Sequence, residues 1–334
     1  MGGGNPVNRV PFVRPARRWL AQRSSRQWAV LFALAFALVW SLVEVLVTQL
    51  HQAYSLVQVE GVRFGVQLLL MVLLWTWRGD AGQGWWRSRR APWHVLRGLS
   101  MLALPFAFAA AVYSGVSIPL ALSGLWFAPL FALALAALWL RERPPAVLWL
   151  GALAGLGAVL LLFQPALPGS PAALLMPLLS GAALAVYLLL TRLLRDEPVQ
   201  TGLFFVAAVG LLVLLPFLPG VWVRPSARDL ALLAGVGAFG YLALWLLDQA
   251  LRRWSLSHLA PLLYAHVLVL QWLPALWRGQ WPSWRLVLAS ALIGGVVAIV
   301  WWRASARRVA RAGTGDSLIG DSGLGAPVSV RGGL

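Results

Sequence analysis

The chain lacks cysteine and lysine altogether, and only 10 of its 334 residues are acidic. Without cysteine it has no disulfide, no thiolate metal ligand and no cysteine nucleophile. Charged residues make up 11% of the chain, whereas an average soluble domain has about 25%. Because 60% of the residues are hydrophobic, a soluble fold of this length could not cover its apolar surface with charge. The composition therefore excludes soluble enzymes, soluble nucleic-acid-binding proteins and disordered chains.

Positive charge comes from arginine alone, and the formal net charge is +17. In a soluble protein such a charge would suggest a nucleic-acid partner. The arginines here lie between long apolar runs, as they do in membrane proteins that carry their positive charge on the cytoplasmic side. We therefore expect a lipid bilayer, and no nucleic acid, as a partner of this chain.

Apolar segments of about the length needed to cross a bilayer recur along the chain. They form two sets of five, near 28–49, 56–76, 95–115, 119–140 and 146–164, and near 171–194, 201–221, 229–251, 257–277 and 284–302. This pattern predicts an all-α integral membrane protein with ten transmembrane helices. Prolines within these segments are expected to kink the helices, namely Pro105, Pro129, Pro177, Pro216, Pro261 and Pro274.

The two ends of the chain differ from its apolar middle. Residues 1–26 are basic, and residues 312–334 are polar and rich in glycine and serine. We expect a basic cytoplasmic tail at the start and a disordered cytoplasmic tail at the end. The first apolar run is too long for a signal peptide, which favours an uncleaved first helix. Most arginines fall on connections that share a side with the termini, which predicts a multi-pass protein of the inner or plasma membrane with both termini in the cytoplasm.

An internal repeat is visible when the chain is shifted by 138 residues. Five positions then match or nearly match, with Trp139, Glu142, Pro144, Gly157 and Val159 falling on Trp277, Gln280, Pro282, Gly295 and Val297. Each half has five predicted helices, and an odd number inverts the second half relative to the first. Inverted repeats recur in secondary transporters, with the substrate site near the bilayer midplane. Chance similarity between leucine- and alanine-rich segments is the alternative. The repeats are expected over 27–165 and 170–303.

The segment 138–165 resembles the end of the first repeat of EamA-type transporters, which belong to the drug/metabolite transporter superfamily. Its Glu142–Arg143–Pro144 is similar to the Glu-x-Pro turn of that family, whereas the second such turn has Gln280 in place of the acidic residue. The resemblance extends over about 25–302 and includes Arg63, Arg97–Gly98 and Ala260–Pro261–Leu262 with Tyr264. It implies ten helices in two inverted five-helix repeats. Within the superfamily, the first half is most similar to the branch that contains S-adenosylmethionine uptake carriers.

Two ionisable residues are expected at membrane depth, where a charge costs about 2.5–3.5 kcal/mol at the bilayer centre. Glu44 in the first predicted helix and Arg63 in the second would lie at similar depths in an antiparallel pair, with Gln67 one turn beyond Arg63. Glu44 would act as a coupling proton site while Arg63 binds a substrate carboxylate or phosphate. Two alternatives stay open: a static ion pair that joins the helices, and side chains that reach the interface without contact.

His266 lies near the middle of the ninth predicted helix, with Tyr264 beside it and Gln271 just over one turn further on. Histidine changes its charge near physiological pH, which suits proton coupling or substrate binding. A buried histidine that donates to a backbone carbonyl is the alternative. By the family resemblance, Pro261 and Tyr264 would belong to a kinked ninth helix at which the cavity opens.

Aromatic side chains inside the predicted helices are candidates for the walls of a substrate cavity. Trp126 and Tyr187, with Tyr113 and Tyr241, could contact a planar substrate, although packing and interfacial positions are the common alternatives.

Two acidic residues at the cytoplasmic ends of predicted helices favour structural roles. Asp248 precedes Arg252 by one turn, which is typical of an ion pair at a helix end. Glu142 lies between Arg141 and Arg143, and a local structural role is expected for it.

Enzymatic chemistry has little support in the sequence. Ala121–Leu122–Ser123–Gly124 lacks the leading glycine of a nucleophile turn, and the four histidines have no metal-ligand spacing beyond His258 and His266, which lie two turns apart. No phosphate-binding loop is present. We expect no catalytic residue, metal or cofactor.

The sequence as a whole therefore predicts a secondary transporter that moves a small polar metabolite by alternating access, driven by a proton gradient or by exchange. The alternative is a non-transporting membrane scaffold or assembly factor, which predicts a closed bundle without a polar cavity. A homodimer, the substrate and the direction of transport are left open.

Overall fold

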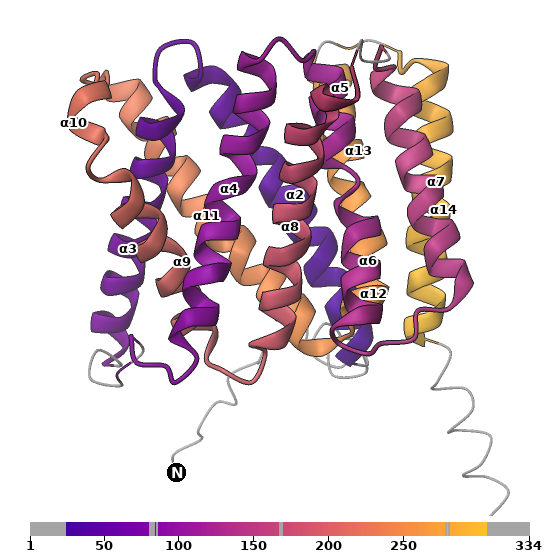
Figure 1. The fold of residues 1–334 in the computed structure, drawn as a ribbon, viewed down its shortest axis with the longest axis horizontal. Coiled ribbons are helices and arrows are strands. Elements are labelled where there is room, and N and C mark those ends of the chain that lie inside the picture. The colour runs from indigo at the N-terminus through magenta and orange to yellow at the C-terminus, as the bar shows by residue number, and fades with distance from the viewer. Residues whose placement is uncertain are drawn as a thin grey trace, which may run out of the picture.

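The computed structural model describes residues 25–79, 84, 86–166, 170–277, 279 and 281–305. Within these residues the regular secondary structure is entirely helical, without a β-strand (Figure 1). The first half contains α2 (Ser25–Leu50), α3 (Leu56–Arg78), α4 (Ala91–Tyr113), α5 (Ile118–Leu125), α6 (Ala128–Leu138) and α7 (Ala146–Phe163). The second half contains η3 (Pro171–Leu174), α8 (Leu175–Leu193), α9 (Val199–Leu214), α10 (Leu218–Val221), α11 (Ala227–Arg253), α12 (Leu256–Leu259), η4 (Ala260–Tyr264), α13 (Ala265–Trp277) and α14 (Trp284–Ser305). The tail expected over 312–334, and most of that over 1–26, lie outside the described residues.

Nine helical segments of the described chain are long and apolar enough to cross a membrane. They coincide with nine of the ten predicted segments. The exception is the segment predicted over 201–221, where α9 has only 16 residues and ends at Leu214. Pro216 lies in the turn that follows, because proline has no N–H to continue the helical hydrogen bonds. The all-helical membrane architecture is confirmed, while the tenth crossing stays a prediction.

Like Pro216, two further prolines predicted to kink helices lie at breaks instead. Pro129 lies in the first turn of α6, directly after a turn that divides the fourth predicted span. Pro261 lies at the start of the 3-10 helix η4, which joins α12 to α13. The first turn of a helix tolerates proline because its N–H groups have no intrahelical partner. Pro105 does lie inside a continuous helix, α4.

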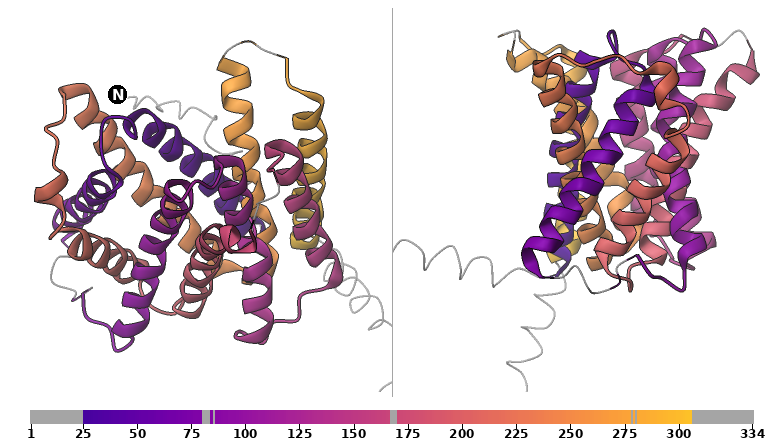
Figure 2. Two further views of the ribbon diagram at one scale, coloured as in Figure 1. Left: turned by 45° about the horizontal axis from the view of Figure 1, so that its top comes forward. Right: turned by 90° about the vertical axis from the view of Figure 1, so that its left-hand side faces the viewer.

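The helices pack in a repeating set of pairs. The first helix of each half packs along the long third helix of the other half, so that α2 lies against α11 and α8 against α4. At one end of the bundle α3 packs on α9, and at the other end α7 packs on α14 (Figures 1 and 2). These contacts place α2, α4, α8 and α11 in the middle of the molecule.

The bundle has two faces of different charge. Helix α2 begins and α14 ends at the lower face in Figure 1, which we call the terminal face, and the opposite face is the distal face. Described arginines near the terminal face are Arg87, Arg89, Arg90, Arg141, Arg143, Arg192, Arg195, Arg252, Arg253 and Arg303, and those near the distal face are Arg224, Arg228 and Arg285. This excess follows the predicted asymmetry. That the terminal face is cytoplasmic stays a prediction.

Candidate functional site

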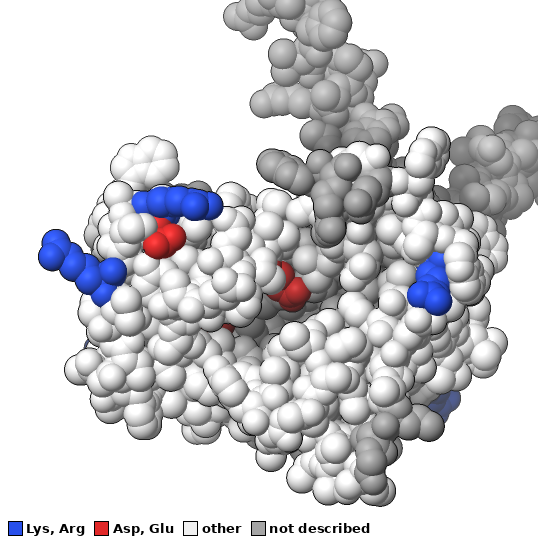
Figure 3. Space-filling model, turned by 90° about the horizontal axis from the view of Figure 1, so that it is seen from above, with Lys and Arg blue, Asp and Glu red and all other residues white. Residues whose placement is uncertain are grey.

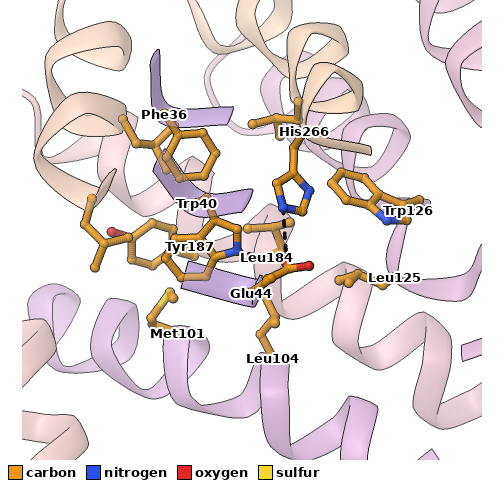
Figure 4. Close-up of a pocket in the computed structure, with 13 residues that line it drawn as sticks. Phe36, Trp40, Glu44, Met101, Leu104, Leu125, Trp126, Leu184, Tyr187 and His266 are labelled. Atoms are coloured by element: carbon orange, nitrogen blue, oxygen red, sulfur yellow. Dashed lines mark hydrogen bonds and ion pairs between the residues drawn. The ribbon is translucent and has the colours of Figure 1, made fainter. Parts of the chain in front are cut away.

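A cavity lies between the central helices. Figure 3 shows the distal face with a hollow that contains an acidic side chain. The cavity is bounded by α2, α4, α5, α8, α11, η4 and α13, and most of its walls are aromatic or aliphatic (Figure 4). Its lining residues are Phe36, Trp40, Glu44, Met101, Leu104, Leu125, Trp126, Leu184, Tyr187, Leu244, Leu247, Leu263 and His266. We call it the central cavity.

Glu44 and His266 face each other across this cavity. The Nε2 atom of His266 lies 3.3 Å from Oε1 of Glu44, and the two come from α2 and α13. Trp40, one turn before Glu44, donates from Nε1 to the same oxygen at 3.1 Å. The glutamate side chain is 37% exposed, whereas the histidine side chain is 3% exposed. Neither ring nitrogen of His266 has a well-formed hydrogen bond within the described chain, so the imidazole has capacity for a ligand.

Trp126 belongs to the cavity wall beside His266, and Tyr264 packs behind Trp126. The ring centroid of Trp126 lies 5.4 Å from that of His266 and 5.9 Å from that of Tyr264. Tyr264 is fully buried behind the wall, and its hydroxyl donates to the carbonyl of Trp126 at 3.0 Å. Tyr187 lines the cavity from α8. Of the predicted residues, the structure thus brings Glu44, Trp126, Tyr187 and His266 together, with Tyr264 as a support.

The alternative of a static ion pair between Glu44 and Arg63 is wrong, and Arg63, which we expected to bind substrate, is not among the residues that line the central cavity. Arg63 pairs with Glu60, one turn earlier on the same helix, with 2.5 Å between Nη2 and Oε2. Its guanidinium also lies 4.4 Å from the ring centroid of Phe64. An acidic residue at this spacing reaches the arginine without help from another helix, so the Glu60-x-x-Arg63 spacing is the signal in the sequence that points to this pair.

Gln67 and Gln271 also lie outside the cavity lining. Gln67 is buried and donates from Nε2 to the carbonyl of Leu203 at 3.2 Å, which joins α3 to α9. Gln271 is half-buried on α13. Tyr113 is 87% exposed at the end of α4, and Tyr241 is a half-buried residue of α11.

Asp248 has a different partner from the one the sequence suggested. Its Oδ1 accepts from Nη2 of Arg97 at 2.6 Å, and the same nitrogen donates to the hydroxyl of Tyr187 at 3.0 Å. The three residues come from α11, α4 and α8 and are all buried. The expected pair with Arg252 is therefore wrong, because Asp248 points into the bundle toward α4, and Arg252 donates to the backbone carbonyl of Glu197.

Glu142 joins the two halves near the terminal face. It accepts from the backbone N–H groups of Leu256 and Ser257 at 3.3 and 2.9 Å, at the start of α12. Arg192 lies 3.9 Å away. A carboxylate is favourable at a helix N-terminus because free N–H groups point toward it. The structural role is as expected, but it acts across halves and not beside Arg141 and Arg143. Gln280 lies outside the described residues.

Glu197, in the connection between α8 and α9, lies against His94 of α4, with 3.2 Å between the carboxylate and Nε2. Partial burial raises the pKa of Glu197, but hydrogen bonds with Ser88 and His94 outweigh it and hold the pKa below its usual range.

No group of three or more possible metal-binding His, Cys, Asp or Glu residues occurs in the part of the chain that the structure describes.

Comparisons with known proteins cover parts of the chain. Residues 27–164 match the EamA-like transporter family. The riboflavin transporter of Vibrio cholerae serotype O1 is 26% identical over 236 residues, which are 66% of this chain and 76% of that protein. A crystal structure of a protein that is 22% identical superposes with a TM-score of 0.73 over 84% of this chain and 99% of that one. At this identity, the structural likeness concerns the fold alone.

Proposed function

Since residues 27–164 match the EamA-like transporter family, we propose that the whole chain is a secondary transporter that moves a small polar metabolite across a cell membrane by alternating access. The observation that carries this proposal is the central cavity, in which a partly exposed carboxylate and a buried imidazole lie among aromatic walls. Sites of this kind, apolar with a few converging polar groups, suit small-molecule ligands.

The proposed architecture is two inverted five-helix repeats, with α9 as the short tenth crossing. The packing pairs support it, because exchanging the halves turns the contact of α2 with α11 into that of α8 with α4. The same exchange turns α3 on α11 into α9 on α4 and leaves α7 on α14 unchanged. In transporters with such repeats the site lies where the halves meet, which is the position of the central cavity between α2, α4, α8 and α11.

The substrate we propose is a small planar heteroaromatic metabolite. Phe36, Trp40, Trp126 and Tyr187 offer ring faces and edges, and aromatic pairs gain energy beyond their buried area. Glu44 and His266 would bind polar groups of such a molecule. Riboflavin is the first candidate because it has this chemistry and because the curated relative is a riboflavin transporter.

Proton coupling is proposed for the Glu44–His266 pair. A proton gained by either the carboxylate or the imidazole changes the charge of the cavity, and histidine as a residue type exchanges protons near physiological pH. A substrate that takes the place of either partner would then change the protonation of the other. An obligatory exchange of two solutes is the second way to drive the same cycle. Neither proton coupling nor solute exchange requires a nucleotide site.

The scaffold alternative predicts a closed bundle without a polar cavity. The central cavity reaches both Glu44 and His266, which counts against it. In the orientation that we propose, the terminal face is cytoplasmic and the central cavity opens to the outside of the cell.

The test is the thermal stability of the detergent-purified protein with a panel of riboflavin, S-adenosylmethionine, amino acids, nucleosides and dicarboxylates. A ligand at about 100 times its Kd adds about 2.7 kcal/mol to the free energy of unfolding, which raises Tm. We expect riboflavin or a related heteroaromatic compound to raise Tm, and we expect His266→Ala to abolish the effect. His51→Ala is the matched control, because His51 is exposed in the connection after α2. A folded protein whose Tm responds to no compound would contradict the proposed substrate class.

A further inference from the structure

Residues on α8 contribute to the wall of the central cavity and, nearer the terminal face, to the wall of a second cavity. Leu184 lines the central cavity, and Thr191 lines the second one, which also has Glu197 and Gly202 in its wall. Thr191 follows Leu184 by seven positions, which corresponds to about 10 Å along the helix. Between them lies Tyr187, which is one turn from each. We call the second space the terminal-face cavity.

Arg97, Asp248 and Tyr187 fill the space between the two cavities. Tyr187 belongs to the wall of the central cavity, while Arg97 and Asp248 belong to the wall of the terminal-face cavity. One nitrogen of Arg97 binds both the carboxylate and the hydroxyl, at 2.6 and 3.0 Å. The arginine comes from the first half of the chain and its two partners come from the second half. Arg97, Asp248 and Tyr187 therefore join the two halves of the chain at a point between the central cavity and the terminal-face cavity.

Gly202 on α9 makes room for this arrangement. A methyl group at this position would overlap Nη1 of Arg97, and it would also approach Oδ2 of Asp248 to 3.7 Å. The guanidinium thus lies against the backbone of α9, and the Nε atom of Arg97 is buried without a hydrogen-bond partner in the described residues. A buried arginine with an unpaired hydrogen-bond donor lowers the stability of the folded protein. Packing alone therefore does not explain the presence of an arginine at this position.

We propose that Arg97, Asp248 and Tyr187 form the gate that closes the transport pathway toward the terminal face. The inference rests on the proposed function, because it assigns the closed side of the same pathway. The central cavity is hollowed toward the distal face (Figure 3), and Tyr187 belongs to its wall. Opening toward the terminal face requires the Arg97–Asp248 pair to separate, because it links the two halves that move apart. The terminal-face cavity is the first space that a solute enters beyond the gate.

The test uses the absence of cysteine from the chain. Leu184→Cys places a single thiol in the central cavity, and a membrane-impermeant maleimide is added to one side of oriented vesicles. We expect labelling of Leu184→Cys from the distal side and little from the terminal side. Adding Arg97→Ala with Asp248→Ala removes the gate without leaving an unpaired buried charge. Labelling from the terminal side should then rise by about tenfold, which corresponds to a loss of about 1.4 kcal/mol of closing free energy.

A second variant keeps all charges in place. Gly202→Ala pushes the flexible end of Arg97 away from α9. Like the double substitution of Arg97 and Asp248, it should increase labelling of Leu184→Cys from the terminal side. Glu60→Gln is the matched control, because it breaks a buried glutamate–arginine pair that lies within α3, and it should leave labelling unchanged.

The gate would be refuted in either of two ways. One is labelling of Leu184→Cys from the terminal side that is already rapid before the gate is altered. The other is terminal-side labelling that stays low in both gate variants while labelling from the distal side persists. The readout needs no substrate, so a wrong gate is distinguishable from a wrong transport proposal, which the ligand panel tests.

Discussion

Buried charged side chains in the described helices have partners of opposite charge, and apart from the Glu60–Arg63 pair these partners lie far apart in the sequence. Asp248 meets Arg97 from 151 residues away, and His266 meets Glu44 across the bundle. An unpaired charge at membrane depth is costly, which selects for such pairs. The residue types and their depth were predictable from the sequence. The partners were not, because sequence spacing reveals contacts only within one helix.

Tyr264 supports the cavity wall through a single hydrogen bond, which gives a prediction at the residue scale. Tyr264→Phe removes the donor to the carbonyl of Trp126 while keeping the ring. Loss of a buried hydrogen bond costs about 1 kcal/mol, so Tm should fall modestly. Because Trp126 contacts the cavity, ligand affinity should fall as well. Thermal melts with and without ligand measure both, and an unchanged affinity would show that the bond does not position Trp126.

Glu197 predicts a pH dependence of stability. Its pKa in the folded protein lies below the usual glutamate value of about 4.3, so the folded state binds a proton less readily than the unfolded state. Its contribution is therefore fully present above the unfolded pKa and is lost as pH falls through the lower folded pKa. Glu197→Gln should lower Tm at pH 7, and the difference from the natural protein should vanish in acid. A difference that grows below pH 4 contradicts this account.

At the scale of helices, hydropathy predicts where a span lies but not how it is divided. The fourth and ninth predicted spans each consist of more than one helix, α5 with α6 and α12 with η4 and α13. The sequence places proline near these breaks, but it predicted kinks in continuous helices, whereas Pro129 and Pro261 lie in the first turn of a new helix and Pro216 follows the early end of α9. The close approach of α8 to α5 was not predictable, because a glycine on a helix does not reveal which backbone it faces.

Gly181 of α8 gives a prediction for this contact. A Cβ atom there would lie 2.8 Å from the carbonyl oxygens of Gly124 and Leu125, and backbone atoms cannot move aside as a flexible side chain can. Gly181→Ala should destabilise the protein by about 1–3 kcal/mol, the usual range for overpacking. Gly157→Ala on α7 is the control, because open space surrounds Gly157, and it should be neutral or stabilising by about 0.5–1 kcal/mol. Equal Tm values for the two variants would contradict the close contact.

At the scale of the whole molecule, the difference in arginine content between the two faces predicts the orientation of the protein in the membrane. The connections of the terminal face are rich in arginine and those of the distal face are not, so by the positive-inside rule we predict that both termini lie in the cytoplasm. Reporter fusions measure this directly. A fluorescent protein at either terminus should fluoresce, and alkaline phosphatase inserted near residue 224, in the connection before α11, should be active. Active phosphatase at the C-terminus would reverse the orientation.

The central claim is that a small metabolite binds in the central cavity and crosses the membrane through this protein. The most direct measurement is uptake of labelled riboflavin, followed by the other compounds of the panel, into proteoliposomes with and without a pH gradient. We predict saturable uptake above that of protein-free liposomes, which is lost in His266→Ala and kept in His51→Ala. Uptake no greater than in protein-free liposomes for every compound, with a correctly folded protein, would contradict the account.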